Sequence, residues 1–211
     1  MIDKQKTVNA ITKALEDKGK RKFSQSVEFI VNFRGIDFAK AENRLNLDIL
    51  LPKGKGKSQK VMVFADGQVA LDAKNAGADE VVDAAGIQKM AADRKRVKMI
   101  AKNHEFIAQT SMMVNVGKSL GQVLGAKGKL PRPIVGQVKD AVDQAKRRVR
   151  LASRGKYLPV AQCVIGSESQ SADELAENFA AVYEKVAAKV LEPNIKSVFV
   201  KLSMGKPVKV A

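Results

Sequence analysis

The stretch KVMVFA, residues 60–65, decides how the rest of the sequence is organised. It is apolar at every position after its first lysine, which is typical of a short strand covered on both faces of a parallel sheet. The earlier stretch SQSVEFIVNF, residues 24–33, has a different pattern, in which apolar and polar residues alternate. Alternation indicates a strand with only one buried face. The sequence therefore predicts two kinds of sheet, one on each side of residue 60.

The segment after residue 65 alternates between helix and strand. Apolar residues at helical spacing predict helices over 66–77, 86–104, 114–125 and 134–149. Short apolar runs between them predict strands over 78–84 and 105–110. Alternation of strands and helices at these lengths is typical of a parallel sheet between two helix layers. We therefore expect residues 61–154 to form an inserted α/β, Rossmann-like three-layer domain.

The outer parts of the chain have the other pattern. A helix is expected over 3–20, and alternating strands over 24–33, 43–52, 159–166 and 197–203. A long amphipathic helix over 171–193 opens with Ser171 and Glu174, the spacing of a capping box. Read in order, these pieces are α-β-β and then β-α-β. They predict a discontinuous α+β outer domain, residues 1–60 plus 155–211, with an antiparallel sheet and two helices on one of its faces.

An inserted domain requires the chain to cross between domains twice. The crossings expected here are PKGKGKSQK, residues 52–60, and RVRLASRGKYLP, residues 148–159. Both are rich in glycine and basic residues, as flexible linkers are. We therefore expect these two connectors to form a hinge.

Charge limits the class of partner. The chain has 38 Lys and Arg against 22 Asp and Glu, a net charge of +16, and no tryptophan. Such a charge balance favours nucleic acid as the partner. A membrane surface is less favoured, because binding to it requires a basic amphipathic helix with bulky apolar anchors. No apolar run reaches membrane-spanning length, and the sequence starts without an apolar signal segment. A single cysteine excludes an internal disulfide and fits a reducing, cytoplasmic setting.

No constellation of residues favours catalysis. Gly117-Lys118-Ser119 matches the end of a phosphate-binding loop, but Met112 occupies the position where the first glycine of that loop is required. The only histidine, His104, is expected to be a charge at a helix C-terminus, and Cys163 a buried structural thiol. The acidic group Asp79, Glu80 and Asp83 lacks calcium-loop spacing. We expect no catalytic, cofactor-binding or metal-binding residues.

Basic segments instead converge near strand ends of the outer domain. They are KGKRKF at 18–23, SRGKY at 153–157 and SMGK at 203–206. Lysine and arginine supply charge for phosphates, small residues let sugar and phosphate approach the backbone, and Phe23 or Met204 can lie against a sugar or base. Glu28 on the first strand can accept a hydrogen bond from a ribose 2′-OH, although a surface residue without such a role is equally compatible with its position.

Several motifs together resemble a known family. They are FRGIDFAKAENR, residues 33–44, VFADG at 63–67, GKLPRPI at 128–134 and SVFVKLSMGKPVKV at 197–210. In these the chain resembles the L-one family of large-subunit ribosomal proteins, the ribosomal stalk protein, in its archaeal or eukaryote-like form, over essentially its whole length. One departure is Ser203, where the family usually has threonine: the hydroxyl is kept and the methyl group is absent.

The resemblance implies a function and its residues. Similar proteins bind large-subunit rRNA directly, form the mobile stalk near the tRNA exit site, assist release of deacylated tRNA and repress translation of their own mRNA. It implies a cytoplasmic ribosome component, monomeric when free, whose partners are rRNA, its own mRNA, tRNA and other ribosomal components. The RNA-binding residues that it and the basic segments indicate are Lys22, Phe23, Glu28, Arg154, Lys156, Ser197, Lys201, Ser203, Met204 and Gly205.

Two alternatives remain open at this point. The α/β block could serve a nucleotide-dependent enzyme acting through Gly117-Lys118-Ser119. Alternatively, charge alone could make the chain a non-specific basic RNA chaperone or a membrane-surface protein, which predicts strong salt dependence without discrimination between RNA folds.

Overall fold

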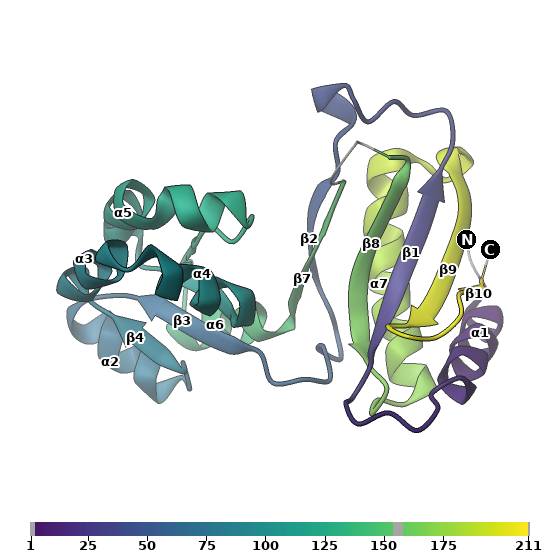
Figure 1. Cartoon of the computed structure of the whole chain (residues 1–211), viewed down its shortest axis with the longest axis horizontal. Helices are drawn as coiled ribbons and strands as arrows, with labels where there is room; N and C mark the ends of the chain where they lie inside the picture. Colours follow the sequence, from purple (N-terminus) through teal and green to yellow (C-terminus); the bar gives the residue numbers. More distant parts are fainter. Residues whose placement is uncertain (1–2, 154–157, 211) are drawn as a thin grey trace. The chain divides into compact units, whose positions relative to one another are not determined.

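The computed structural model describes residues 3–153 and 158–210, and the chain divides into two compact units. Unit 1 is formed by Met1–Lys57 together with Arg147–Ala211, and unit 2 by Ser58–Lys146 (Figure 1). The chain therefore passes from one unit to the other twice, and unit 2 is contiguous in sequence whereas unit 1 is not.

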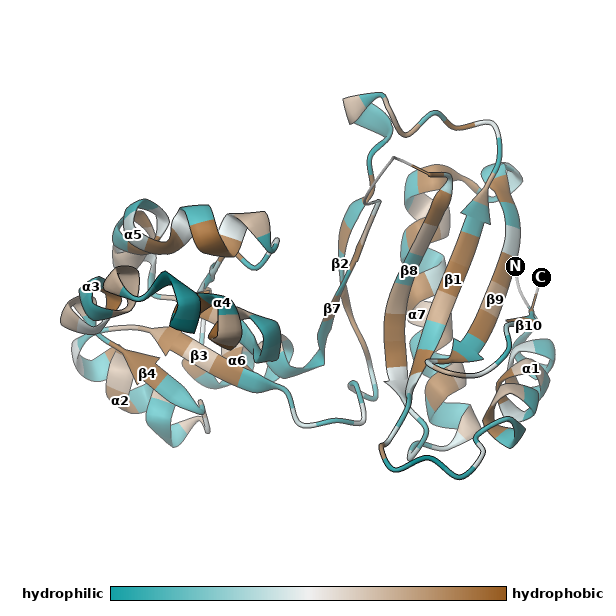
Figure 2. Cartoon of the chain, viewed as in Figure 1, coloured by the Kyte–Doolittle hydropathy of each residue, from teal (hydrophilic) through white to brown (hydrophobic). Residues whose placement is uncertain are grey.

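The main sheet of unit 1 has four antiparallel strands in the order β10-β9-β1-β8. Their bounds are Val208–Lys209, Ile195–Leu202, Ser26–Phe33 and Val160–Ser167. Every second residue of β1 is buried, as the alternation predicts: Val27, Phe29, Val31 and Phe33. Figure 2 shows hydrophobic residues concentrated along β8, β1 and β9.

Two helices cover the buried face of this sheet. They are α1, Lys4–Glu16, and α7, Ala172–Val190, whose apolar stripes join one core with β1, β8 and β9. The capping box predicted for α7 is confirmed, with the Ser171 Oγ accepting from the Glu174 N–H at 3.3 Å and a Glu174 carboxylate oxygen accepting from the Ser171 N–H at 3.0 Å. It satisfies backbone donors that a helix N-terminus leaves unpaired.

The strand predicted over 43–52 does not join the main sheet. It is β2, Asn46–Leu50, and it pairs antiparallel with β7, Arg148–Ala152, in a separate two-stranded sheet (Figure 1). Both edges of β1 are already occupied by β8 and β9, so β1 has no hydrogen-bonding edge left for it. Residues 148–152 were expected to be part of a connector, but their alternating burial shows a strand with Val149 and Leu151 turned inward.

Unit 2 is built on a parallel sheet in the order β4-β3-β5-β6. The strands are Glu80–Val82, Lys60–Phe64, His104–Ala108 and Arg132–Pro133. The helices are α2 Gly67–Asn75, α3 Ala84–Ala92, α4 Arg94–Asn103, α5 Met113–Ala126 and α6 Val138–Arg147. Short 3-10 turns complete the chain at Ala41–Asn43, Thr110–Met112 and Glu192–Asn194.

Strand β3 explains why unit 2 has three layers. Its residues Met62 and Phe64 enter one core with α3, α4 and α5, and Val61 and Val63 enter another with α2 and α6. Both faces of the strand are therefore covered, as the continuous apolar run KVMVFA predicts.

The single helix predicted over 86–104 is two helices, divided at Asp93. The Asp93 N–H donates to the Met90 carbonyl at the end of α3, and its carboxylate accepts from the Arg96 N–H at 3.0 Å at the start of α4. An aspartate can therefore begin a new helix inside a run that has helical spacing throughout. Among the described residues, no helix is both long enough and apolar enough to span a membrane.

Cys163 on β8 is buried, as predicted, and burial raises the pKa of its thiol to about 12. Because only the thiolate reacts, we expect native protein at pH 8 to react with iodoacetamide at least about 100-fold more slowly than protein unfolded in guanidinium chloride. The chain has one cysteine, so mass spectrometry reports this site alone. Equal rates in the native and unfolded protein would show that the thiol is accessible.

Candidate nucleic-acid interface

The face of the main sheet opposite α1 and α7 carries several of the predicted binding residues. Antiparallel pairing sets Glu28 of β1 opposite Lys201 of β9, and Asn32 opposite Ser197. These four side chains are partly exposed, whereas the residues on both sides of Glu28, Asn32 and Lys201 are buried in the core, as is Val198 after Ser197. The period of two along each strand therefore presents one outward row on β1 and another on β9.

Glu28, Lys201 and Ser203 form a hydrogen-bonded group at the end of β9. The Ser203 Oγ lies 3.2 Å from a Glu28 carboxylate oxygen and 3.3 Å from the Ser26 carbonyl oxygen. The Lys201 Nζ donates to the Ser203 carbonyl oxygen at 3.1 Å and lies 3.9 Å from the other Glu28 carboxylate oxygen. Glu28 is therefore held in place by its own neighbours, and the Lys201 ammonium is partly neutralised before any partner arrives.

Gln25 fastens the tip that follows β9 to the segment that precedes β1. Its side chain is 1% exposed, its amide oxygen accepts from the Met204 N–H at 3.0 Å, and its amide nitrogen donates to the Lys18 carbonyl at 2.8 Å. Sequence reasoning missed this residue, because its partner Met204 lies 179 residues away along the chain. The available signal is a polar residue just before an alternating strand, which is too common to single it out.

The tip, residues 203–206, exposes the thioether of Met204 and has no room for a side chain at Gly205. Met204 is 61% exposed, and nearby Phe23 is 54% exposed. The Gly205 N–H donates to the Leu202 carbonyl at 3.0 Å, and a Cβ at Gly205 would lie only 3.1 Å from the Leu202 Cβ. The Asp17 carboxylate accepts from the Lys206 N–H at 2.8 Å and closes the tip.

The structure brings most of the predicted residues together in unit 1. Lys22 and Phe23 lie three and two residues before Gln25, whose side chain accepts from the Met204 N–H. Glu28, Lys201, Ser203, Met204 and Gly205 lie together at the end of β9. Ser197 is four residues from Lys201, about 13 Å along β9, where its hydroxyl accepts from the Asn32 amide at 3.0 Å. Arg154 and Lys156, predicted from the second connector, lie outside the described residues.

Lys57 adds a cation that sequence reasoning did not single out. Its ammonium donates to the Ser24 carbonyl oxygen at 2.6 Å and lies 3.2 Å from the Ser26 Oγ. It comes from the lysine-rich stretch predicted as the first connector, and it contacts the same segment that Gln25 holds.

The residues weighed as catalytic or ligand-binding candidates contribute to the fold. Gly117-Lys118-Ser119 lies inside α5, where backbone N–H groups bond along the helix and cannot cradle a phosphate. His104 follows α4 as its C-cap and begins β5, so the predicted position at a helix end is confirmed. It is buried, with its Nδ1 3.0 Å from the Ile100 carbonyl oxygen. The Asp79 carboxylate accepts from the Val61 N–H, and that of Asp83 caps α3. The described residues contain no cluster of three or more potential metal ligands.

This arrangement suits recognition of a polyanion that has a defined three-dimensional fold. It combines an anchored carboxylate, a hydroxyl and a partly exposed glycine with an exposed thioether, an exposed aromatic ring and several ammonium groups.

Comparison with known proteins settles the family. The model of the "Ribosomal protein L1p/L10e family" matches residues 12–206. The chain belongs to this family. The resemblance to the L-one family noted from its motifs is confirmed.

Relatives match nearly the whole chain. A Methanocella arvoryzae protein is 39% identical over 212 residues, 98% of this chain and 99% of the relative. A Thermofilum pendens protein is 46% identical over 196 residues, 91% and 86% of the two chains. A third, from Archaeoglobus fulgidus, is 39% identical over 215 residues, 100% and 99%. All three are named "Large ribosomal subunit protein uL1".

Replacing Gln25 tests how the tip is fastened. In Gln25→Leu the Met204 N–H loses its acceptor, so we expect its hydrogen exchange to accelerate at least about tenfold, as for a backbone bond that opens locally. Gln25→Glu is the comparison variant: it keeps an acceptor for Met204, loses the donor to Lys18 and adds a buried carboxylate, so it separates the acceptor from the rest of the side chain. Amide exchange followed by NMR, with the Gly205 N–H as internal reference, measures both. Unchanged exchange of Met204 in Gln25→Leu would show that the bond does not hold the tip.

Proposed function

We propose that this chain binds large-subunit rRNA directly through the outward face and tip of unit 1. Membership of the family makes it a structural ribosomal protein of the large subunit rather than an enzyme. The observation that carries the proposal is the group Glu28, Lys201 and Ser203 at the end of β9, beside the exposed Met204 and Phe23.

Each part of this face has a chemical role in reading folded RNA. Met204 and Phe23 offer apolar surface for a sugar or base. Gly205 lets the tip pack tightly against Leu202, because a Cβ there would lie only 3.1 Å from the Leu202 Cβ. Glu28 accepts from a ribose 2′-OH or a base amine through the oxygen that Ser203 leaves free, which favours RNA over DNA. Lys22 and Lys57 supply positive charge for phosphates, and Ser197 extends the face along β9.

The two-unit organisation supports the stalk role. Each unit has its own hydrophobic core, and the chain crosses between them only twice. We propose that the two places where the chain crosses between the units, at Lys57–Ser58 and at Lys146–Arg147, act as a hinge. Unit 1 then holds the rRNA, and unit 2 moves with the mobile stalk near the tRNA exit site to assist release of deacylated tRNA. The domain boundaries expected from sequence, 1–60 plus 155–211 and 61–154, remain part of this proposal.

Translational repression would use the same face. An mRNA segment that reproduces the fold of the rRNA site would occupy the residues that bind rRNA, so the two RNAs would compete. The charge-only alternative differs, because it predicts that any folded RNA competes equally well. The nucleotide-dependent enzyme has no site in α5 for its phosphates.

Filter binding tests the proposal directly. At a salt concentration of about 0.2 M, an rRNA stalk fragment should bind at least about 100-fold more tightly than an unrelated folded RNA of equal length. Met204→Ala should weaken the stalk complex by about 1–3 kcal/mol through lost packing and leave the slope of log K against log salt unchanged.

The matched variant is Lys22→Met, which removes a charge and keeps an apolar stem. We expect it to flatten the salt slope by about 0.7–0.9, the contribution of one phosphate contact. Lys201 is the poorer choice, because its ammonium also holds the Ser203 carbonyl, so its removal disturbs the tip as well as the charge. Equal binding of both RNAs, with Met204→Ala like wild type, would contradict specific recognition.

A further inference from the structure

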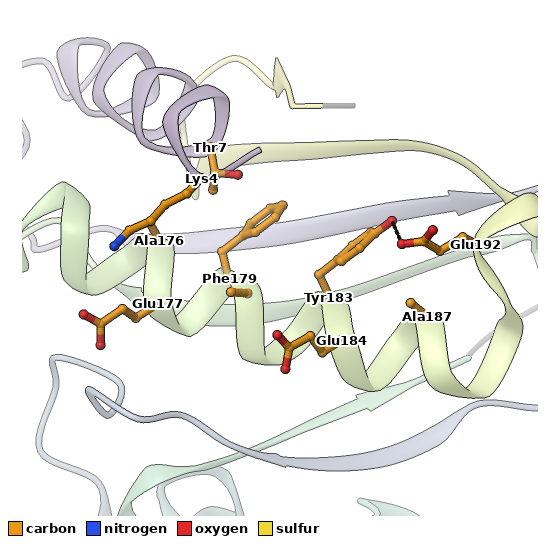
Figure 3. Close-up of a pocket in the computed structure, with 10 residues that line it drawn as sticks. Lys4, Thr7, Ala176, Glu177, Phe179, Tyr183, Glu184, Ala187 and Glu192 are labelled. Carbon is orange, nitrogen blue, oxygen red and sulfur yellow. Dashed lines mark hydrogen bonds between the residues drawn. The ribbon is translucent and has the colours of Figure 1, made fainter. Parts of the chain in front are cut away.

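An apolar groove lies on the helix side of unit 1, across the sheet from the proposed RNA face. It lies between α1 and α7 and has a volume of about 490 Å³ (Figure 3). Its floor includes Phe179, whose ring packs edge-on against Phe29 of β1 at 5.1 Å between centroids. Glu28, the next residue on β1, points to the opposite side of the sheet. A ligand in this groove and an RNA on the other face could therefore be bound at once.

The wall of the groove is one stripe of α7. Ala176, Ala180, Tyr183 and Ala187 all line it, at spacings of four, three and four residues. They lie within the 12 residues from Ala176 to Ala187, about 16 Å or three turns of helix. Three small side chains and one ring leave a trough along the helix axis, the form of surface against which a second helix can pack closely.

Tyr183 is held in a fixed position in this trough, between Ala180 and Ala187. Its ring stacks on Phe179 with 6.4 Å between centroids, and its hydroxyl donates to a Glu192 carboxylate oxygen at 3.4 Å, drawn as the dashed line in Figure 3. Burial, together with the Glu192 charge and hydrogen bond, raises the pKa of the Tyr183 hydroxyl, so this donor stays protonated at neutral pH. The groove is therefore formed in advance of binding.

The rim of the groove is acidic, although the chain as a whole is strongly basic. Three glutamates line it, Glu177, Glu184 and Glu192, against one lysine, Lys4. Glu177 also pairs with Lys53 at 3.4 Å, an exposed contact that lowers its charge only in part. Residues 168–192 hold six acidic and two basic residues, 6 − 2 = 4 negative charges, in a chain of net charge +16.

This combination decides the class of occupant. An acidic rim repels RNA and acidic peptides, and the apolar trough needs apolar side chains to fill it. We propose that the α1–α7 groove docks a basic amphipathic helix of another protein, about three turns long, with its apolar side chains in the trough and lysine or arginine beside Glu177, Glu184 and Glu192. The inference is independent of the proposed RNA contacts.

Two synthetic helical peptides of about three turns test the proposal with the full-length chain. One carries leucine on one face and lysine on the rest, and the other has glutamate in place of each lysine. In about 0.15 M salt the Debye length is about 8 Å, so local charges decide the outcome rather than the overall +16. NMR titration should show the lysine peptide shifting the amides of Ala180, Tyr183 and Ala187, with the glutamate peptide at least about tenfold weaker.

A matched pair of variants on α7 controls for added charge. Ala180 and Ala188 are both exposed, but only Ala180 lines the groove. Ala180→Arg should weaken the lysine peptide at least about tenfold, Ala188→Arg should leave its affinity within about twofold, and both should keep the RNA affinity of wild type.

Four results would overturn the inference. They are equal binding of the two peptides, equal effects of Ala180→Arg and Ala188→Arg, no binding of either peptide, and a wild-type dimer in sedimentation that Ala180→Arg dissociates. The last would make a second copy of this chain the occupant. If specific RNA binding is not observed while the lysine peptide still binds as expected, the proposed function is contradicted and the inference about the groove is supported.

Discussion

The pairing of β1 on both of its edges is the constraint on which unit 1 depends. β8 and β9 both run antiparallel to it, and the helices α1 and α7 cover one face of the three strands. Because side chains alternate, this register sends Phe29 into the core and Glu28 outward. A slip of one residue would bury a carboxylate and expose an aromatic ring. The same packing that stabilises the core therefore also places the proposed RNA face and fixes which residues it contains.

The sequence predicts those parts of the fold that depend on local pattern. The alternation in residues 24–33, the apolar run at 60–65 and the capping box of α7 each correspond to an observed element. The pairing of β2 with β7 could not be read in this way, because an arginine-rich strand looks like a linker and its partner lies about a hundred residues away. The division at Asp93 was hidden by helical spacing on both sides of it.

In the candidate site, too, some residues can be predicted from the local sequence and others depend on distant contacts. Its exposed members, such as Met204 and Phe23, have side chains that are unusual beside so many lysines, and the family motif marks their positions. Gln25 carries no such mark, because its importance comes from the Met204 N–H, 179 residues further along the chain. Lys201 is predicted from sequence as a cation available to RNA, whereas the structure shows its ammonium already bonded to the Ser203 carbonyl and near the Glu28 carboxylate.

The discontinuity of unit 1 has a consequence for the order in which the chain acquires structure. Synthesis delivers β1 early, but its two neighbours begin only at Val160 and Ile195. Unit 2 is complete at Lys146, before either neighbour exists. The nascent chain therefore holds a finished parallel sheet while the first helix and strand of unit 1 still wait for partners. Until β8 and β9 emerge, the apolar side of β1 has no core to enter, which makes this interval the one in which the chain is most open to association with other proteins.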